Sequence, residues 1–130
     1  MPRSQGSRST AVAASLAVLF GVVTMLAGTR VLLGADPGYV VYPPLLVFNT
    51  LMGVAYVAVG VAAWRRPRLG VYGAGAVLAL NTTALAAVAG LYTSGSSVAG
   101  TSMGAMTFRT VAWLVLFLVL MRATRHETRP

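Results

Sequence analysis

Four long apolar runs are the feature that most constrains this sequence. They cover residues 11–34, 45–64, 70–92 and 103–121. About 20 helical residues cross a hydrocarbon core about 30 Å thick, and each run has about that length. Backbone groups in lipid must be hydrogen-bonded within the protein, which favours helices, and the runs lack the alternating polarity of barrel strands. The sequence therefore predicts an all-α membrane protein, a bundle of four transmembrane helices.

The composition supports the same fold class. Hydrophobic residues make up 57% of the chain and charged residues 9%, against about a quarter charged in soluble domains. The chain contains no cysteine, which excludes disulfides and thiolate chemistry. We expect one membrane domain over residues 11–121, with an N-terminal tail over 1–10 and a basic C-terminal tail over 122–130. Heavy use of Ala, Val, Gly and Arg, without lysine, favours a bacterial source.

The positions of the arginines predict the orientation. Eight lie before the first run, between the second and third, or after the fourth: Arg3, Arg8, Arg65, Arg66, Arg68, Arg122, Arg125 and Arg129. Four spans put these regions on one side, and basic segments stay in the cytoplasm. We therefore expect a multi-pass protein of the inner (plasma) membrane with both termini cytoplasmic. The first run is longer than the apolar region of a signal peptide, so we expect it to be retained as a span.

The net charge of +8 could also indicate nucleic acid, but the basic residues lie beside apolar runs and not on a polar face interleaved with aromatics. The expected partners are therefore membrane lipids, together with a second copy of the chain or a larger membrane complex, and no nucleic acid.

Small residues recur at helical spacing along three of the runs. In the second run, for example, Asn49, Gly53, Tyr56 and Gly60 fall on one helix face. Small residues on one face let helices approach closely in lipid. We therefore expect helix-packing roles for Gly21, Gly28, Gly53, Tyr56, Gly60, Gly75 and Gly90.

A second group of residues is polar and lies in or beside the apolar runs. The candidate cluster comprises Arg30, Asp36, Asn49, Asn81, Thr107 and Arg109. Arg109 is the most informative member, since it lies about 9 Å inside its predicted helix, with Trp113 one turn away on the same face. Arg30 is expected to extend to the outer head groups and Asn81 to hydrogen-bond between helices.

Two interpretations of the cluster remain open. Two arginines against the single acid on that side leave an excess positive charge, which suits an anionic or carbonyl-bearing ligand or an acidic lipid head group. The same residues also suit a structural latch between the helices.

The residues needed for catalysis are not recognisable. No acid lies within a run, so a carboxylate-driven proton exchanger is not expected. His126 stands alone in the tail, and no Ser or Thr has an adjacent base. We expect no catalytic residue, no metal, no cofactor and no enzymatic activity. The leading hypothesis is a structural or accessory membrane protein that acts through helix–helix contacts. The alternative is a small-solute or anion carrier or channel that uses the Arg/Asn cluster.

Overall fold

The computed structural model describes residues 5–38, 41–95 and 100–128, and four long helices dominate it. They are α1 (Gln5–Leu32), α2 (Pro43–Arg65), α3 (Pro67–Thr93) and α4 (Gly100–Thr128). Each contains a span long and apolar enough to cross a membrane: Arg8–Leu32, Pro43–Arg65, Pro67–Thr93 and Ser102–Arg125. The prediction of an all-helical chain with four such helices is confirmed.

Proline and glycine set the helix boundaries. Pro43 and Pro44 occupy the first turn of α2, where a missing N–H removes no helical hydrogen bond. Arg66 is extended (φ −142°, ψ 95°), as expected before Pro67, and it alone separates α2 from α3. Longer connections follow α1 and α3, where Gly34 (φ 109°) and Gly95 (φ 84°) take left-handed conformations that favour glycine.

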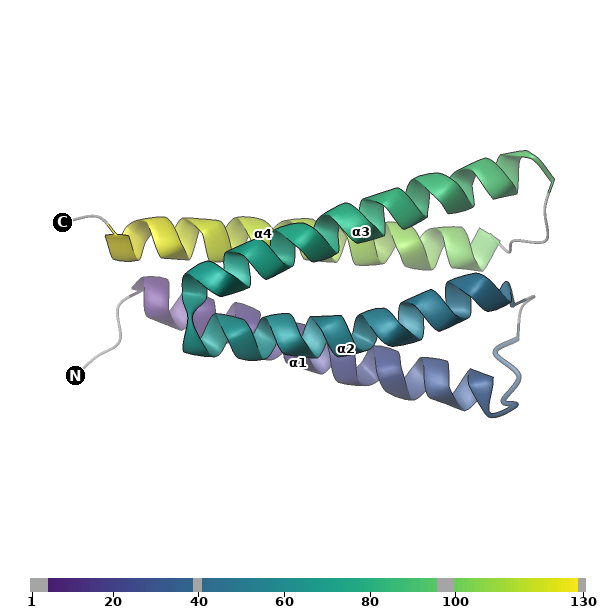
Figure 1. The fold of residues 1–130 in the computed structure, drawn as a ribbon, viewed down its shortest axis with the longest axis horizontal. Helices are drawn as coiled ribbons and strands as arrows, with labels where there is room; N and C mark the ends of the chain where they lie inside the picture. Colours follow the sequence, from purple (N-terminus) through teal and green to yellow (C-terminus); the bar gives the residue numbers. More distant parts are fainter. Residues whose placement is uncertain (1–4, 39–40, 96–99, 129–130) are drawn as a thin grey trace.

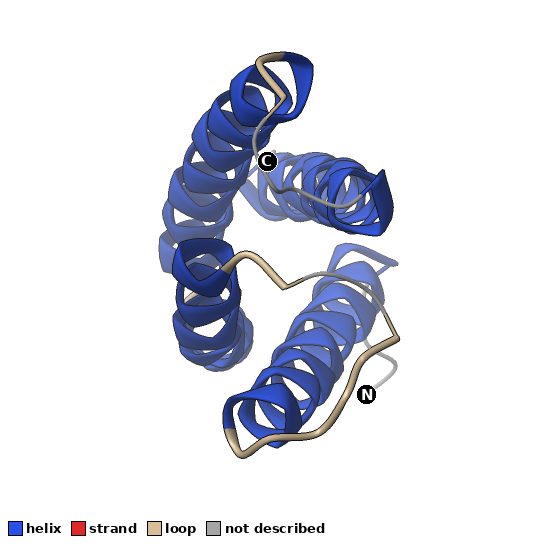
Figure 2. Cartoon of the chain, turned by 90° about the vertical axis from the view of Figure 1, so that its right-hand side faces the viewer, coloured by secondary structure: helices blue, strands red, loops and turns tan. Residues whose placement is uncertain are grey.

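The helices form two hairpins, α1–α2 and α3–α4, packed side by side (Figure 1). The start of α1, the α2–α3 connection and the end of α4 lie together at one end of the bundle, which we call the basic end. The α1–α2 and α3–α4 connections lie at the opposite end, called the loop end, which faces the viewer in Figure 2. Helix α1 also packs against α4, and α2 against α3, so each helix has two main neighbours.

Glycines bring α1 and α2 into backbone contact. A Cβ on Gly21 would lie 2.6 Å from the carbonyl oxygen of Gly53, and a Cβ on Gly60 would lie 2.8 Å from that of Ala14. A Cβ on Gly28 would collide with the side chain of Thr50. Only residues without a side chain fit such a close approach, and the helices gain dispersion contacts along this interface.

Of the other residues with expected packing roles, two are packed inside the bundle and one faces open space. Tyr56 is fully buried, and Gly75 faces the ring of Phe117 on α4, with 3.3 Å from its ideal Cβ position to Cε2. Gly90 differs from this expectation, because a Cβ there would meet no heavy atom within 4 Å. It lies toward the loop end of α3, on a surface that the described part of the chain leaves open.

The outside of the bundle is apolar. Large hydrophobic side chains such as Leu19, Leu51, Leu80 and Val115 are exposed along all four helices, while the fully buried interior is small. Water would hydrate that exterior at a large free-energy cost, whereas lipid chains cover it without one. The apolar surface and the four spans together characterise a multi-pass membrane protein.

Candidate functional site

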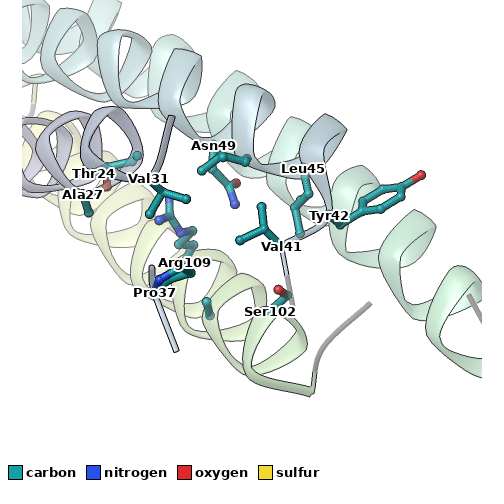
Figure 3. Close-up of a pocket in the computed structure, with 13 residues that line it drawn as sticks. Thr24, Ala27, Val31, Pro37, Val41, Tyr42, Leu45, Asn49, Ser102 and Arg109 are labelled. Atoms are coloured by element: carbon teal, nitrogen blue, oxygen red, sulfur yellow. The ribbon is translucent and has the colours of Figure 1, made fainter. Parts of the chain in front are cut away.

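A pocket opens at the loop end of the bundle, between α1, α2 and α4 (Figure 3). Its volume is about 190 Å³. Its walls come from three helices and from the connection between α1 and α2: Thr24, Ala27, Gly28, Val31, Pro37, Val41, Tyr42, Leu45, Leu46, Asn49, Ser102, Ala105 and Arg109. Most of these side chains are apolar, so the few polar groups among them determine what the pocket can hold.

Asn49 and Arg109 direct their side chains into this pocket from α2 and α4 (Figure 3). Both residues are half-buried. Nη1 of Arg109 and Oδ1 of Asn49 are buried and have no hydrogen-bond partner. Polar atoms buried in a protein are nearly always paired, so Nη1 of Arg109 lacks an acceptor and Oδ1 of Asn49 lacks a donor.

An aromatic side chain supports the guanidinium of Arg109. The ring of Phe20 on α1 lies beneath it, with 6.0 Å from Cζ to the ring centroid. Phe20 in turn stacks on Phe108 with a centroid distance of 5.9 Å and meets Tyr56 edge-on at 5.4 Å. The sequence places Trp113 one turn from Arg109 on the same helix face. The ring that contacts the guanidinium is Phe20.

Arg109 is the charged side chain among the described residues that line the pocket. None of the described residues that line it is acidic. Asp36 is exposed in the neighbouring connection, where its carboxylate accepts a hydrogen bond from the backbone N–H of Gly38 (2.8 Å). The N-terminal ends of α2 and α4 lie at the loop end and add partial positive charge, while the C-terminal ends of α1 and α3 there add partial negative charge. Within the described chain, no negative charge neutralises Arg109.

Of the six polar residues of the predicted cluster, the structure brings two together, Asn49 and Arg109. Arg30 and Asp36 are exposed at the loop end and do not line the pocket. Thr107 is also exposed, and its hydroxyl donates to the carbonyl of Met103 in its own helix (2.9 Å). Asn81 lies in the bundle core and does not line the pocket.

Two buried hydroxyl residues of the site, Thr24 and Ser102, were not part of the predicted polar cluster. Thr24 shares a helix face with Gly21 and Gly28, so its position at the α1–α2 interface is visible in the spacing. Ser102 belongs to a Gly/Ser-rich stretch whose composition predicts a loop, but in the structure it lies in the first turn of α4.

The bundle is filled below the pocket. Tyr56 and Trp113 are fully buried and pack against each other with a centroid distance of 4.8 Å. The phenol of Tyr56 donates to Oδ1 of Asn81 (3.2 Å). Nδ2 of Asn81 and Nε1 of Trp113 are further buried donors without a partner. These residues close the interior between the pocket and the basic end.

Comparisons with known protein families, with characterised proteins and with solved structures find no match for this chain. The chemistry of the pocket is therefore the guide to function. A guanidinium nitrogen in an apolar wall offers a strong donor to an oxyanion, and the adjacent hydroxyl and amide groups supply further hydrogen bonds.

Proposed function

We propose that this chain is a membrane carrier that binds an anionic group in the Asn49–Arg109 pocket. The observation that supports it is the half-buried guanidinium of Arg109, whose Nη1 has no partner in a pocket without an acidic wall. An arginine inside a membrane bundle is costly unless it is paired, and such residues usually mark a ligand pathway. An anionic ligand supplies the missing counter-charge and acceptor.

A carrier fits the interior better than an open channel does. Tyr56 and Trp113 have 0% exposure, and they lie about two helical turns and one turn further along their helices than Asn49 and Arg109. A bound anion cannot pass these rings while the helices keep this arrangement. Transport therefore requires the two hairpins to move relative to each other, as expected for alternating access.

The orientation is part of the same proposal. The basic end carries six of the described arginines, namely Arg8, Arg65, Arg66, Arg68, Arg122 and Arg125. The positive-inside rule favours a cytoplasmic basic end, so that the pocket opens to the outside of a bacterial inner membrane.

Uptake into proteoliposomes tests this function. The purified chain, reconstituted in vesicles, is expected to accelerate the uptake of radiolabelled carboxylates or phosphate. Arg109→Gln is expected to lower the rate about tenfold or more, because a charge-assisted hydrogen bond is lost. Arg30→Gln is the matched control, since it removes an arginine at the same end but outside the pocket. No uptake by the parent protein, or equal rates for the parent and Arg109→Gln, would refute the carrier.

A second candidate function, an accessory protein that acts through helix contacts, is favoured by one surface of α3. Ala79, Thr82, Ala86 and Gly90 fall on one face and are all exposed. The hydroxyl of Thr82 bonds only to its own helix, at the carbonyl of Leu78 (2.8 Å). Small residues on a lipid-facing surface permit close packing with a further helix.

The oligomeric state in mild detergent tests this second candidate. Ala86→Leu is expected to dissociate a complex built on the α3 face. Leu80→Phe, at an exposed position on another side of the same helix, is expected to leave that complex intact. A protein that is monomeric and co-purifies with no partner before any substitution argues against the accessory role.

A further inference from the structure

An apolar groove lies beside the pocket, along the line where α1 meets α4. The groove has a volume of about 530 Å³. Its lining is apolar throughout and comes from these two helices only: Leu16, Leu19, Phe20, Val23, Phe108, Ala112, Val115 and Leu116. It opens on the lipid-facing side of the bundle, where Leu19, Val23 and Val115 are exposed.

The pocket and the groove have adjacent lining residues on both helices. On α1 the groove ends at Val23 and the pocket begins at Thr24, and on α4 Phe108 lines the groove while Arg109 lines the pocket. The stacked rings of Phe20 and Phe108 stand at the junction, and the guanidinium of Arg109 lies over Phe20. The guanidinium of Arg109 therefore lies next to the end of an apolar, lipid-facing groove.

The length of the groove matches a membrane chain. From Phe108 to Leu116 it extends about 12 Å along α4 at 1.5 Å per residue. Half of a hydrocarbon core is about 15 Å thick. Because Arg109 already lies about 9 Å inside its helix, an alkyl chain that follows the groove from that level reaches the bilayer midplane and ends just beyond it.

We propose that the ligand is a single-chain amphiphilic anion taken from the bilayer. Its carboxylate or phosphate head occupies the pocket against Arg109, and its alkyl chain lies in the α1–α4 groove. The small pocket offers the polar groups of Arg109 and Asn49 to a head group, whereas the apolar groove favours an alkyl chain by burying its methylene groups. This assignment rests on the proposed function, because it specifies the substrate class of the same pocket.

Photo-crosslinking tests the assignment with the full chain in phosphatidylcholine nanodiscs. The probe is a fatty acid that carries a diazirine in mid-chain, and the comparison probe is its methyl ester, which has no charge. The acid is expected to label peptides that contain residues 16–23 and 108–116. Arg109→Gln is expected to lower this labelling about tenfold, whereas the ester labels weakly and does not respond to the substitution.

A variant that fills the groove distinguishes binding of the ligand's alkyl chain from binding of its head group. Val115 is 54% exposed, so Val115→Trp places bulk in the groove without entering the core. It is expected to reduce labelling by the acid severalfold and to leave the affinity of the pocket for acetate unchanged, because acetate has no chain to occupy the groove. Leu80→Trp on the lipid-facing side of α3 is the control and is expected to change neither readout.

The outcomes distinguish the two proposals. Equal labelling by acid and ester, or labelling insensitive to both Arg109→Gln and Val115→Trp, overturns the amphiphile and reduces the groove to ordinary lipid contact. If acetate or phosphate uptake still depends on Arg109 in that case, the carrier stands and its substrate is a small soluble anion. If that uptake is also absent, both proposals fail.

Discussion

The phenol of Tyr56 donates a hydrogen bond to the side-chain carbonyl of Asn81, with 3.2 Å between the two oxygens, and both residues are fully buried. This bond joins α2 of one hairpin to α3 of the other. Tyr56 also packs on Trp113 from α4 and on Phe20 from α1. One side chain therefore contacts all three other helices in the middle of the bundle.

Removing this bond is expected to destabilise the bundle. Tyr56→Phe keeps the ring contacts but leaves both polar ends of the Asn81 side chain unpaired. The free energy of unfolding, measured in detergent by denaturant titration, is expected to fall by about 1 kcal/mol. Thr82→Val is the control, because the hydroxyl of Thr82 bonds only within its own helix. Equal stability of Tyr56→Phe and the parent would show that the bond contributes nothing to the fold.

The close approach of α1 and α2 gives a second expectation. An added methyl group at Gly21 meets the backbone of Gly53 at 2.6 Å, and backbone cannot turn aside as a flexible side chain can. Gly21→Ala is expected to cost about 1–3 kcal/mol of stability in the same unfolding assay. Gly104→Ala adds the same methyl group where nothing lies within 4 Å, and is expected to be neutral or slightly stabilising. A similar loss for both variants would contradict the packing described for the α1–α2 interface.

Helix positions in this chain follow from sequence because lipid imposes a simple requirement. Each span must be apolar and long enough, so the runs at 11–34 and 45–64 lie close to the structural spans Arg8–Leu32 and Pro43–Arg65. Helical spacing also places Gly53, Tyr56 and Gly60 on one buried face. Local sequence carries this information, since it depends on periodicity alone.

The grouping of polar residues depends on helix rotation and on pairing, which the sequence of one helix does not determine. Asn49 and Arg109 come from α2 and α4, and only the packing of both against α1 brings them to one pocket. Asn81 is equally polar, but its rotation on α3 directs it to Tyr56. Phe20 resembles any apolar residue of α1, so its place beneath Arg109 has no signal in the sequence.

Cysteine accessibility tests the proposed orientation. The chain has no cysteine, so single substitutions at exposed positions need no altered background. Ala35→Cys and Ser94→Cys lie at the loop end, and Arg66→Cys lies at the basic end. A membrane-impermeant maleimide is expected to label the first two in intact bacterial cells and the third only after lysis. Labelling of Arg66→Cys in intact cells would reverse the orientation.

Trp113 offers an optical readout of the pocket, since it lies one helical turn inward of Arg109 and is fully buried. The chain has two tryptophans, and Trp64→Phe removes the exposed one at the basic end. Addition of a carboxylate or phosphate is expected to change the emission of the remaining indole in a saturable way. The double variant Trp64→Phe, Arg109→Gln is expected to give no such change. A response that persists without Arg109 would place the anion elsewhere.

The most direct test of an anion at Arg109 is a calorimetric titration of the purified protein in nanodiscs with hexanoate, a short carboxylate that remains in water. The parent protein and Arg30→Gln are expected to bind it at a single saturable site. Arg109→Gln is expected to weaken the affinity about tenfold or more. Heats that do not saturate for the parent, or the same isotherm for Arg109→Gln, would contradict the assignment of this pocket.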